Sequence, residues 1–95
     1  MKVNFNRQFT GFDGKPLKEK INDELAKALF GFNQFKGEQV TPEQKLMAYR
    51  LFQKLNAEGE VEISTEEASF IKHLAAESLL AGAYGQVYDL IEGNN

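Results

Sequence analysis

Residues 3–21, VNFNRQFTGFDGKPLKEKI, decide the fold class of this chain. If residues 2–9 are extended, four alternate side chains share one face: Val3, Phe5, Arg7 and Phe9. The residues between them are Asn and Gln, which is the alternation of a half-buried strand. The pair Asp13-Gly14 tolerates the positive φ of hairpin turns, so we expect the chain to reverse there. In residues 17–21, Leu17, Glu19 and Ile21 alternate with two lysines, which predicts a shorter return strand.

A hairpin of two strands is marginally stable in water, so helices elsewhere in the chain are needed to pack against it. Asn22 is a candidate N-cap, and an apolar stripe with carboxylates in its first turn predicts a short helix over residues 23–30. Gly31 is a typical helix stop. Residues 31–40 contain two glycines and no helical period, which predicts a loop that carries two phenylalanines.

Two capping boxes mark the later helices. In Thr41-Pro42-Glu43-Gln44 an N-cap hydroxyl precedes proline at the first helical position, with Gln at the third, and the helix it opens is expected to end in a left-handed cap at Gly59. Ser64-Thr65-Glu66-Glu67 is the second box and opens a helix over residues 65–80.

The remaining segments complete an α+β prediction. Residues 60–63 alternate and could add a third short strand against the hairpin. Gly82 or Gly85 is expected to break or bend the helix before a last short one, which spans residues 84–91. The expected fold is a single α+β domain of residues 1–95, in which an N-terminal β-hairpin packs against three to four helices.

The composition bounds the class of protein. A chain of 95 residues favours one domain, and the absence of cysteine excludes disulfides and thiolate chemistry. The 11 basic and 14 acidic residues are interspersed, so no polybasic footprint for nucleic acid or anionic lipid appears. Without a signal-peptide core or an apolar run of membrane-spanning length, the whole chain is expected to be a soluble cytoplasmic protein.

No constellation of residues with catalytic or metal-binding spacing is apparent. His73 is the one histidine, and Glu77 at i+4 could reach it, but two groups do not make a metal site. The acidic residues between 58 and 67 are explained by a solvated strand and a helix start, where the dipole favours carboxylates. We therefore expect no catalytic residue, no metal, no cofactor and no enzymatic activity.

The aromatic residues are the candidates for partner binding. Phe32 and Phe35 lie on the predicted loop, and Tyr84 and Tyr88 share a face of the last helix. Aromatic residues of a small domain lie more often in the core than on a binding surface. Either position, core or partner-binding surface, therefore stays open for the two phenylalanines. The predicted role is binding of another protein or self-association. The alternative is a nucleic-acid-binding transcriptional regulator with a helix-turn-helix, which the absence of lysine or arginine after Lys72 disfavours.

The order of motifs adds a family resemblance. The motifs are DGKP at 13–16, DELAKAL at 23–29, LMAYRL at 46–51, VEISTEE at 61–67 and YGQVYDLIE at 84–92. This arrangement, which covers nearly the whole chain, resembles small uncharacterised accessory proteins encoded by phages and prophages. The resemblance implies an accessory or assembly role, and because none of its motifs is catalytic, it transfers no functional residues.

Overall fold

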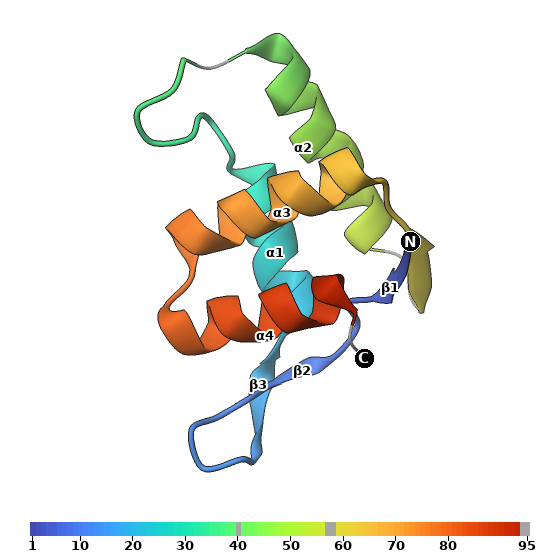
Figure 1. Cartoon of the computed structure of the whole chain (residues 1–95), viewed down its shortest axis with the longest axis vertical. Helices are drawn as coiled ribbons and strands as arrows, with labels where there is room; N and C mark the ends of the chain where they lie inside the picture. Colours follow the sequence, from blue (N-terminus) through green and yellow to red (C-terminus); the bar gives the residue numbers. More distant parts are fainter. Residues whose placement is uncertain (40, 57–58, 94–95) are drawn as a thin grey trace.

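The chain forms an α+β arrangement, as the sequence predicts, in which short strands precede the helices and one further strand lies between the second and third helices (Figure 1). The computed structural model describes residues 1–39, 41–56 and 59–93. The elements in these residues are β1 (Lys2–Asn4), β2 (Gln8–Thr10), β3 (Pro16–Lys20), α1 (Ile21–Phe30), α2 (Pro42–Leu55), β4 (Glu60–Glu62), α3 (Thr65–Ser78) and α4 (Ala81–Glu92).

The core lies between the helices. α1 packs against α2 and α3, and α3 packs against α4, so α1 runs through the middle of the molecule (Figure 1). Each helix supplies a side chain with no solvent exposure: Leu25, Leu51, Ile71 and Val87. The β2–β3 hairpin projects beyond the helices at the foot of the view, near the start of α1 (Figure 1).

The hairpin turn forms where the sequence predicts it. β2 and β3 are antiparallel, with Thr10 opposite Pro16. The Gly14 N–H donates to the Gly11 carbonyl at 2.9 Å, and Gly14 has φ of 81°, a left-handed conformation that glycine adopts without strain.

The predicted strand over residues 2–9 is interrupted, which corrects two expectations. The Asn6 N–H donates to Asn4 Oδ1 at 2.9 Å and the Arg7 N–H donates to the Phe5 carbonyl at 2.8 Å, so local turns replace the strand between β1 and β2. Arg7 is consequently exposed instead of sharing the buried face. The predicted third strand exists as β4, but it pairs with β1, Val3 opposite Val61, in a sheet separate from the β2–β3 hairpin.

The interrupted segment also sets the start of α1. The Ile21 N–H donates to the Arg7 carbonyl at 2.7 Å and the Asn22 N–H donates to the Phe5 carbonyl at 3.0 Å. Backbone carbonyls thereby satisfy donors that a side-chain cap would otherwise serve. The prediction of Asn22 as N-cap is therefore wrong: α1 begins at Ile21, after Lys20, without a side-chain cap.

The two predicted capping boxes differ in the structure. At α3 the box is closed, because Ser64 Oγ accepts from the Glu67 N–H at 3.1 Å and Glu67 Oε1 accepts from the Ser64 N–H at 2.8 Å. At α2, Thr41 Oγ1 accepts from the Gln44 N–H at 3.1 Å, but Gln44 Oε1 is buried without a hydrogen-bond partner among the described residues, so this cap is one-sided.

The ends of the later helices differ from the prediction. α2 ends at Leu55, so the left-handed Gly59, with φ of 80°, lies beyond the helix instead of capping it. α3 ends at Ser78, before the predicted Leu80. Extended backbone at Leu79 and Leu80 separates α3 from α4, whereas both predicted glycine breaks lie inside α4. The prediction of a break at either glycine is wrong, because glycine costs a helix only about 1 kcal/mol, which tertiary contacts can offset.

Candidate protein-binding surface

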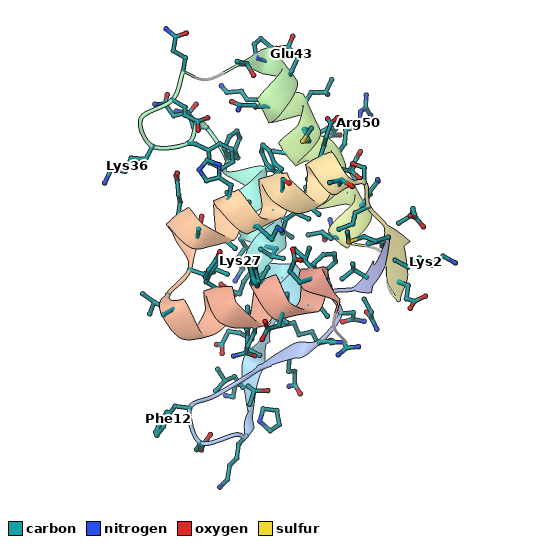
Figure 2. The ribbon with its side chains drawn as sticks, viewed as in Figure 1. Lys2, Phe12, Lys27, Lys36, Glu43 and Arg50 are labelled. Carbon is teal, nitrogen blue, oxygen red and sulfur yellow. The ribbon has the colours of Figure 1, made fainter. Side chains whose placement is uncertain are left out.

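The tip of the hairpin presents one aromatic side chain to solvent. Phe12 is 107% exposed, and Figure 2 shows it projecting from the loop between β2 and β3. The turn places it there, since the Gly11 N–H donates to the Lys15 carbonyl at 2.8 Å and Gly14 closes the reversal. A phenylalanine in this position gains nothing from the core of its own chain.

An apolar hollow lies beside this tip. It has a volume of about 470 Å³ and separates the hairpin from the connection between α3 and α4. Its apolar wall includes Leu80, which is 86% exposed, and Leu17, which is 42% exposed. We call the following residues the hairpin surface: Phe12, Leu17, Leu79, Leu80 and Ala83.

Gln86 holds the hairpin against α4. Its Nε2 donates to the Thr10 carbonyl at 2.8 Å, and its Oε1 accepts from the Thr10 N–H at 2.8 Å. The same Nε2 donates to the Gly82 carbonyl at 3.1 Å, within α4. The side-chain amide therefore pairs with the outer edge of β2 as a neighbouring strand would, and it sets the position of the tip relative to the hollow.

The rim of the hollow carries two glutamates, and the tip of the hairpin carries a lysine. Glu19 and Glu24 line the hollow, and Glu24 Oε2 also pairs with Lys27 Nζ at 3.3 Å. Lys15 follows the turn, where its N–H donates to Asp13 Oδ1 at 3.0 Å. Within the described residues, neither Lys15 nor Glu19 makes a side-chain ion pair.

The structure places the two loop phenylalanines against α3. Phe35 is 3% exposed and stacks on His73 with ring centroids 3.7 Å apart. Phe32 is half-buried and makes edge contacts with Phe35 and Phe70 at centroid distances of 4.9 and 5.2 Å. The carboxylate of Glu77 accepts from the Lys36 N–H at 3.0 Å and thereby holds the loop to α3. Phe35 thus offers almost no area to a partner in this arrangement.

Tyr84 and Tyr88 lie near each other on α4, with ring centroids 6.1 Å apart. Tyr84 packs partly against the core, and Tyr88 is exposed, with Lys72 Nζ at 5.3 Å from its ring centroid. The hydrogen bond to Glu92 raises the pKa of Lys72 above its ordinary value. Each tyrosine is two residues from Gln86, about 200° around the helix, so this pair faces away from the hairpin. The structure does not bring the tyrosines together with the loop phenylalanines.

A second exposed aromatic residue provides a comparison surface. Phe30, at the end of α1, is 73% exposed and makes an edge contact with Phe52 at a centroid distance of 5.2 Å. It borders an open hollow of about 620 Å³ along α1, whose rim mixes lysines with acidic residues.

The histidine lies beside an acidic residue of the same helix. His73 Nε2 lies 3.1 Å from Glu77 Oε2, the i+4 contact that the spacing suggested. Among the residues that the structure describes, no three His, Asp or Glu side chains form a group that could hold a metal ion, and no helix is long and apolar enough to cross a membrane.

In the helix-turn-helix alternative, Gln86 would lie on the helix that faces DNA, but its side-chain amide is hydrogen-bonded to the Thr10 backbone.

Phe12 is the residue of the hairpin surface that the sequence reasoning missed. A signal for it was present, because an apolar residue occupies a turn whose other positions, Gly11, Asp13 and Gly14, are of the types that turns prefer. The sequence predicts Leu80 at the end of a helix and within a smooth surface of small and apolar residues, 79–83, that could bind a partner, and the structure shows that extended backbone exposes it. Comparisons of the chain with protein-family models, with curated proteins and with solved structures find no match.

Proposed function

We propose that this chain is a non-enzymatic protein that binds another protein through the hairpin surface. We assign it the accessory or assembly role of the small phage and prophage proteins that its order of motifs resembles. The observation that carries the proposal is the full exposure of Phe12 next to an apolar hollow of about 470 Å³. Aromatic anchors beside apolar pockets dominate the free energy of many protein interfaces.

Folding alone does not account for the hairpin surface. Phe12 and Leu80 are the most exposed of the large apolar residues that the structure describes, at 107% and 86%, and Phe30 follows at 73%. Covering a phenylalanine removes about 150–250 Å² from water, worth several kcal/mol of free energy at about 25 cal/mol per Å². A partner that covers both residues gains this free energy, which supports a binding role for the surface.

The surface along α1 is a weaker candidate. Its exposed aromatic, Phe30, already rests against Phe52, and its rim carries lysines as well as acidic residues, including Glu19 and Glu24, which also line the hollow beside the hairpin tip. An aromatic side chain that already packs on a neighbour, beside charges of both signs, is typical of a solvated surface without a partner. Phe30 therefore serves as the control position.

A site-specific crosslinking experiment tests the proposal. A photo-activated phenylalanine analogue replaces Phe12 in one variant and Phe30 in another, and both are irradiated in cells that express the chain. We expect a discrete protein adduct from position 12 and none, or a diffuse one, from position 30. The proposal fails if position 12 gives no adduct or the same diffuse pattern as position 30. Both side chains are exposed, so neither replacement threatens the core.

A further inference from the structure

We infer that a second copy of this chain occupies the hairpin surface, with Phe12 of each copy inserted into the hollow of the other. The inference rests on the proposed function and names its partner. It is motivated by the projecting side chain of Phe12 and by the hollow that Phe12 helps to line, between the hairpin and the connection from α3 to α4.

This adjacency suits a two-fold dimer. In a two-fold interface the same patch of both subunits meets, so a patch must carry both a projection and the recess that accepts it. The hairpin surface has both, Phe12 as the projection and the wall of Leu17 and Leu80 as the recess. Gln86 fixes the two parts relative to each other, which lowers the ordering cost of association.

Charge complementarity favours the same arrangement. Lys15 is three residues beyond Phe12, and the rim of the hollow carries Glu19 and Glu24. When Phe12 enters the hollow of the second copy, Lys15 approaches that acidic rim, and the two-fold axis repeats the contact. Since Lys15 and Glu19 make no ion pair within the described part of one chain, both charges are available.

Extension of the hairpin sheet is a poorer route to the dimer. The outer edge of β2 is occupied by Gln86, and β3 carries Pro16, Lys18 and Lys20, residue types that discourage pairing of an edge strand. Insertion of side chains is therefore the expected mode. Two inserted phenylalanines and the walls that receive them bury on the order of 1,000 Å² in total, which predicts a reversible dimer.

A charge-swap experiment tests the inference. Light-scattering chromatography and sedimentation over a concentration series measure the dissociation constant of the native chain, Lys15→Glu, Glu19→Lys and the double variant. We expect each single change to weaken the dimer roughly three- to tenfold, because it disturbs two symmetric contacts, and the double variant to recover to within about twofold. Phe12→Ser should be monomeric throughout, whereas the control Phe30→Ser should keep the native dissociation constant.

The outcomes separate the two proposals. A native chain that stays monomeric at every concentration overturns the inference, and so does a double variant no tighter than the singles. If the purified chain is monomeric while position 12 crosslinks to a different protein, the dimer is excluded and the proposed function stands. An adduct of twice the chain mass from position 12 supports both the binding function and the dimer. A monomeric chain that gives no adduct from position 12 contradicts both.

Discussion

At the scale of single residues, Phe12 and Phe35 show that similar local sequence leads to opposite burial. Both lie in glycine-containing loops, yet Phe12 is fully exposed and Phe35 is buried. Phe35 meets Phe70 and His73 on α3, whereas Phe12 projects from the tip of the hairpin into solvent (Figure 2). The burial of an aromatic residue thus depends on the element that faces it, which the loop sequence does not reveal.

This contrast predicts different effects on stability. Phe35→Ala should lower the free energy of unfolding by about 3–5 kcal/mol, because it leaves a cavity between the loop and α3. Phe12→Ala should change the free energy of unfolding of the monomer by no more than about 0.5 kcal/mol. Urea denaturation at a concentration where the chain is monomeric measures both. Equal losses would contradict the assignment of Phe35 to the core and Phe12 to the surface.

At the scale of elements, one glutamine ties the hairpin to the helices. A two-stranded hairpin is marginally stable alone, and here Gln86 supplies β2 with the pair of hydrogen bonds that a further strand would give. The first turn of α1 contributes from the other side, where its N–H groups bond to the Arg7 and Phe5 carbonyls. The hairpin therefore depends on tertiary contacts at both ends.

We expect Gln86→Ala to loosen the hairpin without unfolding the helices. The Thr10 N–H loses its acceptor, so its hydrogen exchange should become faster, and the free energy of unfolding should fall by about 1–2 kcal/mol. The matched control is Gln53→Ala, since Gln53 Nε2 donates to the exposed Tyr49 hydroxyl at 3.1 Å, a contact within one helix at the surface. Unchanged exchange at Thr10 in the Gln86 variant would show that the hairpin is held by other contacts.

At the scale of the whole molecule, one core joins the two ends of the described chain. Val3 and Phe5 from the first residues belong to the same buried cluster as Val87 and Ile91 of α4. β1 and β4 are also far apart in sequence and pair directly. The same cluster includes Leu25 of α1, Leu51 of α2 and Ile71 of α3, so among the described residues one core joins the helices to the N-terminal segment.

This organisation predicts a single cooperative unfolding transition. Circular dichroism in the far ultraviolet follows all helices, whereas tyrosine fluorescence is weighted towards Tyr84 and Tyr88 on α4, with Tyr49 on α2 as the third contributor. The two signals should give the same midpoint in urea within error. An earlier loss of the tyrosine signal would mean that α4 detaches before the remaining helices unfold.

The sequence by itself determined the features that depend on neighbours along the chain. The turn at Asp13-Gly14, the start of α2 after Thr41 and the closed capping box at Ser64 follow from backbone preferences and hydrogen bonds that span three or four residues. The α+β class follows as well, because the periods of the apolar residues distinguish the N-terminal strands from the later helices.

The tertiary structure alone decided what depends on distant partners. The pairing of β1 with β4, the uncapped start of α1 and the continuation of α4 through its glycines rest on contacts between segments far apart in sequence or on packing that outweighs a small propensity. The candidate surface belongs to this class. Phe12 and Leu80 line one hollow, and Gln86 holds the hairpin there by binding Thr10, 76 residues away, a contact of a range that no local pattern encodes.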